Sequence, residues 1–151
     1  AAGLALAWFC AISPVLAEGR RWISDSTDEA VTLIYGTPES DDMLLSLVCE
    51  KANKTMILWY VPQPIPVKAP SELPITISSE AGGMQLTAAG THSDEIDSYS
   101  LEAQTPLTPE LARLLTAGKT LTIKAEKTTA NLPLDDVALK GAEELTAACR
   151  K

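Results

Sequence analysis

Alternating apolar and polar residues predict β-strands over most of the chain before residue 104. Val31, Leu33 and Tyr35 occupy every second position of residues 30–35, which is the pattern of a strand with one buried face. Comparable runs predict further strands at residues 21–24, 43–50, 55–61, 75–77, 84–86 and 99–103. These runs indicate a protein that is mainly β.

A different pattern begins at Thr108, where the sequence predicts a short helix. Thr108 is a suitable N-cap, and Pro109 suits the first helical position. The spacing i, i+3, i+4 gives the helix one apolar stripe, made of Leu111, Leu114 and Leu115. Gly118 is well placed to end the helix at its C′ position.

The remainder of the chain predicts one strand and a second helix. Residues 119–127 alternate as a strand, and Asp135 or Asp136 then caps a helix that runs to Cys149. Mostly small residues line one side of this helix, namely Ala138, Gly141, Ala142, Leu145 and Cys149. Gly141 costs about 1 kcal/mol relative to Ala inside a helix, so we expect close packing against another element there.

The order of these elements predicts the fold class. Asn53-Lys54 has the composition of a tight turn, so the strands on either side are expected to form a hairpin. Strands in hairpin order followed by late helices favour an α+β fold with a mainly antiparallel sheet. A β sandwich and a half-open barrel both fit, with two C-terminal helices flanking one strand. Residues 18–151 are expected to form this single globular domain.

Residues 1–17 differ from the rest and have the pattern of a signal peptide. They carry no charge, are rich in Ala and Leu, and give way abruptly to Glu18. Val15 and Ala17 occupy the −3 and −1 positions that a signal peptidase recognises, and Pro14 interrupts the apolar run. A basic n-region is absent, so the signal peptide is expected to be N-terminally incomplete. An apolar core helix and a membrane anchor are the alternatives, although a membrane span needs roughly 20 apolar residues.

Removal of this segment would change the pairing of the three cysteines. Cys10 would leave with residues 1–17, and only Cys49 and Cys149 would remain in the exported chain. Two such cysteines pair by default in an oxidising compartment, so we predict a disulfide between them. Closing a loop of about 100 residues stabilises by ~4.7 kcal/mol in the chain-entropy model. Two buried free thiols are the alternative.

The charge of the chain argues against nucleic acid and anionic membranes as partners. Twenty acidic and twelve basic residues give a formal net charge of −8 at pH 7. A nucleic-acid-binding protein needs a basic face, whereas the Lys and Arg residues here are scattered in ones and twos. The same shortage of clustered basic residues argues against attraction to an anionic membrane surface.

Residue types that carry catalysis are sparse. His92 is the single histidine and lies in a polar stretch with Ser93 and Asp94, which predicts a solvated loop. The sequence contains no GxSxG, HExxH, CxxC or glycine-rich phosphate loop. The acidic clusters at residues 41–42 and 94–97 lack the spacing of calcium ligands and are interpreted as solvated turns. No cofactor is expected.

Aromatic residues and prolines mark the predicted binding surface. Trp22 and Trp59 are expected in the core, whereas Tyr60 directly precedes a proline-rich stretch and is expected to be exposed. Alternate prolines cannot lie in a paired central strand, because each lacks a backbone donor. An exposed edge where a partner protein adds a strand is therefore predicted at Tyr60, Pro62, Pro64 and Pro66.

The C-terminal third resembles a module of small periplasmic proteins. The resemblance lies in residues 111–123, in residues 132–134 and in the small-residue helix that ends at Cys149. In this pattern the chain is similar to the invasion-associated locus B family and to type VI secretion accessory proteins of the VasI kind. The resemblance implies an exported, β-rich protein without catalytic residues, and it assigns no binding residue.

These observations predict a small periplasmic or secreted bacterial protein that acts as a binding or accessory module and not by catalysis. Its partner is expected to be another protein of the cell envelope, and the mature form is expected to have no membrane span. One alternative is an inhibitor of a periplasmic or cell-wall enzyme, a role that a disulfide-linked β domain suits. Another is a hydrolase that uses His92.

Overall fold

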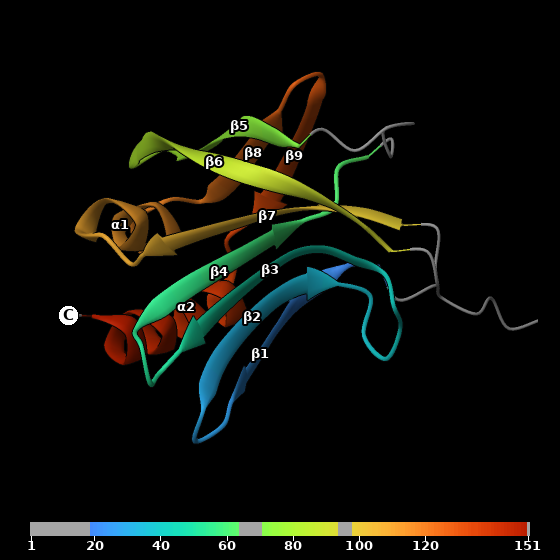
Figure 1. Cartoon of the computed structure of the whole chain (residues 1–151). Helices are drawn as coiled ribbons and strands as arrows, with labels where there is room; N and C mark the ends of the chain where they lie inside the picture. Colours follow the sequence, from blue (N-terminus) through green and yellow to red (C-terminus); the bar gives the residue numbers. More distant parts are fainter. Residues whose placement is uncertain (1–18, 64–70, 94–97, 151) are drawn as a thin grey trace, which may run out of the picture.

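The computed structural model describes residues 19–63, 71–93 and 98–150, so the signal peptide predicted at residues 1–17 lies outside the described chain. The described residues form strands and helices in the order shown in Figure 1. Their bounds are β1 Arg21–Ser26, β2 Ala30–Gly36, β3 Met43–Glu50, β4 Thr55–Tyr60, β5 Glu72–Ser79, β6 Gly82–Ser93, β7 Ser98–Pro106, α1 Pro109–Ala117, β8 Thr120–Ala125, β9 Thr128–Pro133 and α2 Asp136–Cys149.

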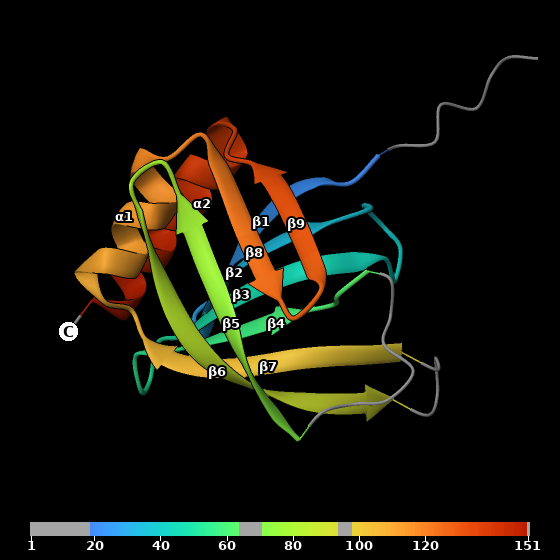
Figure 2. The same ribbon diagram turned by 90° about the horizontal axis from the view of Figure 1, so that it is seen from above.

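All strands of the described residues belong to one antiparallel sheet, whose order is β1-β2-β3-β4-β7-β6-β5-β8-β9. The sheet curls, so that β5, β8 and β9 lie across the molecule from β1, β2 and β3 (Figures 1 and 2). Both helices lie together at one side of this half-barrel (Figure 2). The predicted α+β fold with a mainly antiparallel, half-open barrel is confirmed.

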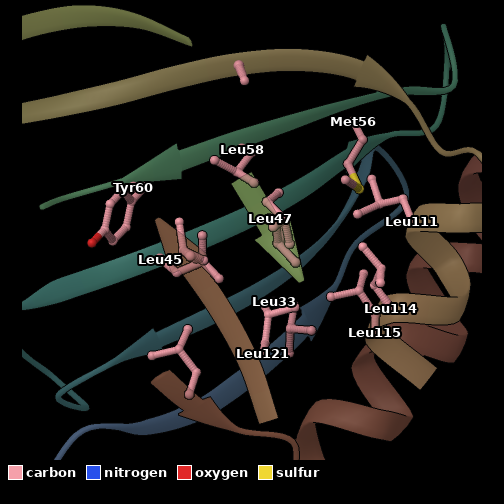
Figure 3. Close-up of a cluster of buried hydrophobic side chains, with 14 of the residues drawn as sticks. Leu33, Leu45, Leu47, Met56, Leu58, Tyr60, Leu111, Leu114, Leu115 and Leu121 are labelled. Carbon is pink, nitrogen blue, oxygen red and sulfur yellow. The ribbon is translucent and has the colours of Figure 1, made fainter. Parts of the chain in front are cut away.

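The core fills the inside of the curl and uses the apolar positions of the strand pattern. Leu33, Leu47 and Leu58 lie opposite one another on β2, β3 and β4, and each is almost completely buried (Figure 3). Full burial of such a side chain stabilises by about 1.5–3 kcal/mol. Three leucines of α1 close the core at its helical end, Leu111, Leu114 and Leu115.

Both helices begin at the caps that the sequence predicts. The side chains of Thr108 and Asp135 each accept a hydrogen bond from a backbone N–H in the first turn of α1 and α2. Gly141 lies where α2 crosses the sheet, and a Cβ there would lie 2.6 Å from Cδ1 of Leu33. The close packing predicted at Gly141 is therefore confirmed.

The helices flank two strands and not the single strand predicted. The expected strand at residues 119–127 corresponds to β8, after which the chain turns and returns antiparallel as β9. The turn contains Glu126 at a φ of 49°, a left-handed conformation that glycine or asparagine usually takes. Because Glu126-Lys127 carries no such turn residue, the sequence pattern does not indicate this hairpin.

Gly118 ends α1 for a reason other than the one expected. A C′ glycine usually adopts a left-handed conformation, but Gly118 is extended, with φ −92°. A Cβ at this position would lie 2.6 Å from Cβ of Ser79. Glycine is therefore required here because the chain passes very close to the end of β5.

The predicted disulfide is present and joins Cys49 in β3 to Cys149 at the end of α2, with the Cα atoms 5.9 Å apart. Both cysteines are buried. At the other end of α2, the indole N–H of Trp22 in β1 donates a hydrogen bond to the carbonyl of Pro133, just before the helix. Helix α2 is thus attached near both of its ends to the first strands of the sheet.

Candidate functional site

The structure does not place the predicted binding surface at Tyr60. This side chain is 1% exposed and points into the core (Figure 3). Its hydroxyl is hydrogen-bonded to Thr128 of β9. Burial raises the pKa of this hydroxyl. The expectation that Tyr60 is exposed at an edge is wrong, because β4 is paired on both sides, with β3 and with β7. Pro62 is buried, and Pro64 and Pro66 lie outside the described residues.

His92 lies in β6 and not in the solvated loop that the sequence predicts. It is exposed and pairs across the sheet with Tyr99 of β7. The polar composition around His92 hides the strand, because this part of β6 gains its register from pairing with β7 and not from an alternating pattern. Asp94 lies outside the described residues, so the hydrolase alternative stays a prediction.

Asp42 is the centre of a polar cluster that fixes the loop between β2 and β3. Arg20 donates hydrogen bonds of 2.8 and 2.7 Å to its carboxylate, and the hydroxyl of Thr37 donates another of 2.7 Å. These bonds, that from Arg20 first, lower the pKa of Asp42 to about 2. Part of the acidic cluster at residues 41–42 is therefore an ion pair and not a solvated turn. Within the described ranges, no group of three or more His, Cys, Asp or Glu side chains could hold a metal ion.

Replacing Asp42 by Asn is expected to lower the free energy of unfolding at pH 7 by up to about 1 kcal/mol, because the Asp42 side chain is 39% exposed and such ion pairs are weak. Its pKa is lower in the folded chain than the ordinary 3.8, so the stabilisation is present above about pH 4 and is lost as the pH falls toward 2. Urea unfolding from pH 7 to 2 measures the difference. Asp41→Asn is the control, and a difference independent of pH would contradict the assignment.

The sheet has a free edge at β1. All residues of β1 pair with β2, and within the described chain β1 pairs with no other strand. An edge strand presents alternate backbone N–H and C=O groups that a further strand can pair with. Near its start β1 is linked to β9, the other terminal strand, through the bond from Trp22 to Pro133. The later residues of β1 therefore form the candidate docking edge.

Hollows of ≈ 420 Å³ and ≈ 530 Å³ lie beside α2, and the larger one borders β1. This larger hollow, of ≈ 530 Å³, is lined by Ser24, Asp25 and Ser26 of β1 and by Asp136, Val137, Lys140 and Glu144 of α2. Successive side chains of a strand point to opposite faces. The hollow is lined by residues of both alternations of β1, a strand whose other side pairs with β2, and so it borders the unpaired side of this strand. We call this hollow the β1–α2 groove.

The walls of the β1–α2 groove combine apolar and acidic groups. Val137 is 44% exposed and is the one large hydrophobic side chain that is exposed in the described part of the chain. The hydroxyl of Ser24 donates a 3.4 Å hydrogen bond to Glu144, which ties the two walls together. Lys140 lies 4.0 Å from Glu144 on the same helix. The groove therefore offers backbone groups on one side and an apolar contact on the other.

A second hollow, of ≈ 420 Å³, lies between the two helices. Its lining comprises Pro109, Ala112, Arg113, Thr116, Glu143, Thr146, Ala147 and Arg150. Both of its walls are helical, so their backbone groups are paired within the helices except near the helix ends at Pro109 and Arg150. This hollow therefore offers mainly side chains, whereas the β1–α2 groove also offers an unpaired strand.

The fold and the groove together define an α+β domain with an open strand edge beside a helix. Comparisons of the chain with protein-family models, with curated proteins and with solved structures gave no match. The resemblance of the C-terminal third to the invasion-associated locus B family therefore stays a prediction. No helix in the described ranges is long and apolar enough to cross a membrane.

One residue in the sequence indicates the groove, although none of the patterns described under Sequence analysis includes it. Val137 lies outside the small-residue face of α2, whose members Ala138, Gly141 and Ala142 are buried against the sheet. Val137 precedes Gly141 by about one helical turn, so it lies at the margin of the buried face, where its apolar side chain is partly exposed. Nothing comparable marks Ser24 to Ser26, because a strand's sequence does not reveal which of its edges is paired.

Proposed function

We propose that the chain is an exported, non-catalytic binding or accessory protein, and that it docks an extended segment of a partner protein along β1. The observation that carries this proposal is the free edge of β1, which faces Val137 of α2 across the β1–α2 groove. A strand added at such an edge gains affinity from main-chain hydrogen bonds, and the neighbouring helix contacts its alternate side chains. The partner we propose is another protein of the cell envelope.

Export is supported by the cysteines and by the N-terminal sequence. A buried disulfide between residues 100 positions apart is typical of proteins that fold in an oxidising compartment. Residues 1–17 have the composition of a signal peptide. We therefore propose a periplasmic or secreted location.

Replacing Val137 by Gln is expected to weaken partner binding about fivefold, because it removes roughly 1 kcal/mol of apolar contact. The matched control is Ala147→Gln, which places the same side chain on α2 but in the second hollow. The chain with its disulfide intact is used to capture partners from a periplasmic extract, and the affinity of the captured protein is then measured for each variant. Hydrogen exchange of the complex should show slower exchange in β1.

Equal binding by both variants, together with unchanged exchange in β1, would place the contact elsewhere and refute strand addition at this edge. Capture of no partner by the wild-type chain would count against a binding function. Loss of binding with Val137→Gln alone, with slower exchange confined to residues 21–26, would support it.

A further inference from the structure

We infer that the segment docked in the β1–α2 groove is basic, an inference that rests on the proposed function. The groove lining contains three carboxylates, those of Asp25, Asp136 and Glu144, and one ammonium group, that of Lys140. Lys140 compensates them weakly, since its side chain is 77% exposed and 4.0 Å from Glu144. An extended segment with Lys or Arg side chains would place opposite charges beside these carboxylates.

Acidic residues also lie beyond the end of β1. Asp28 and Glu29 lie in the turn to β2 and are both exposed, although Lys51 donates a hydrogen bond to the carbonyl of Thr27 in the same turn. The whole chain carries a formal charge of −8. A basic segment would therefore be attracted before contact, as well as paired after it.

The same charges argue against a second copy of this chain as the occupant. A second copy carries the same excess of carboxylates in its own groove, three against one ammonium group. Its β1 strand has one basic residue, Arg21, and would bring a further carboxylate, that of Asp25. A partner with a complementary sequence, basic at some positions and apolar where it meets Val137, fits the groove better.

Two synthetic peptides test the inference directly. One alternates Lys with Thr and Val over eight residues, and the other carries Glu at every Lys position. Fluorescence anisotropy with the disulfide-bonded chain should give a Kd about tenfold lower for the Lys peptide at low salt, with a smaller ratio at high salt. Slower hydrogen exchange in β1 on addition of the Lys peptide locates the binding.

Variants of adjacent glutamates on α2 supply the matched control. Glu144→Gln combined with Asp25→Asn should weaken the Lys peptide about fivefold, because each exposed pair contributes roughly 0.5 kcal/mol. Glu143→Gln repeats the glutamate replacement of this double variant one residue earlier, where Glu143 lines the second hollow. Its affinity for the Lys peptide should equal that of the wild-type chain.

The outcomes separate this inference from the function on which it rests. Equal affinity for both peptides, with exchange slowed in β1, would overturn the charge preference and leave strand addition in place. No effect of either peptide on β1 in the folded chain would overturn both. Concentration-dependent dimerisation that protects β1 would show that a second copy is the occupant and would also overturn the inference.

Discussion

Replacing Cys49 and Cys149 together by Ala is expected to lower the free energy of unfolding by about 4.7 kcal/mol. The disulfide joins residues 100 positions apart, and in the chain-entropy model a loop of this length loses that much stabilisation when it is opened. Small domains are stable by roughly 5–15 kcal/mol, so the double variant should lose a large fraction of its stability. Urea unfolding followed by tryptophan fluorescence measures the loss, because Trp22 is buried in the core.

Reduction of the wild-type chain supplies the control for this double replacement. Reduced wild type and the double variant should unfold at similar urea concentrations, and the oxidised chain should unfold at a much higher one. A thiol reagent should leave Cys49 and Cys149 unmodified until the chain is reduced. A loss below about 1 kcal/mol would contradict the assignment of the disulfide as a main source of stability.

The disulfide also bears on the proposed docking site. Helix α2 forms one wall of the β1–α2 groove, and Cys149 attaches the end of this helix to β3. Gly141 and Ser24 bring the middle of the helix against β1. Opening the disulfide frees one end of this wall, so reduction should weaken partner binding more than Val137→Gln does, while β5 and β6 keep their slow hydrogen exchange.

Much of the fold follows from local patterns in the sequence. Alternation places Leu33, Leu47 and Leu58 on one face, and the structure buries all three. Thr108 and Asp135 cap the helices because their side chains satisfy backbone N–H groups that the first turn leaves unpaired. The disulfide follows because two cysteines remain once residues 1–17 are set aside.

The order of the strands does not follow from these patterns. Alternation tells which face of a strand is buried but not which strands lie beside it. Strand β4 pairs with β7, and β5 pairs with β8, so the paired residues lie 40 or more positions apart in each case. These long-range pairings make β4 a central strand and leave β1 as an edge. The sequence predicts a binding surface at the end of β4. The long-range pairings leave the free edge at β1 instead, so the candidate groove lies there.

Replacing Tyr60 by Ala is expected to lower the free energy of unfolding by about 3–5 kcal/mol, as loss of a buried aromatic ring usually does. The ring lies among Leu45 and Leu101 on neighbouring strands and is 1% exposed. Tyr60→Phe keeps the ring and removes only the hydrogen bond to Thr128, so its expected loss is about 1 kcal/mol.

Trp59→Ala is the matched control for Tyr60→Ala, because Trp59 is the neighbouring residue on the opposite face of β4. Trp59 is partly exposed, and its indole N–H donates a 3.0 Å hydrogen bond to Glu102. Truncation there removes less buried surface, so the loss of unfolding free energy should be smaller than for Tyr60→Ala.

If Tyr60 instead formed part of a binding surface, Tyr60→Ala would leave the unfolding free energy nearly unchanged and would weaken partner binding. A stability loss with the ranking Tyr60→Ala, then Trp59→Ala, then Tyr60→Phe would place Tyr60 in the core and leave β1 as the edge where a partner can dock.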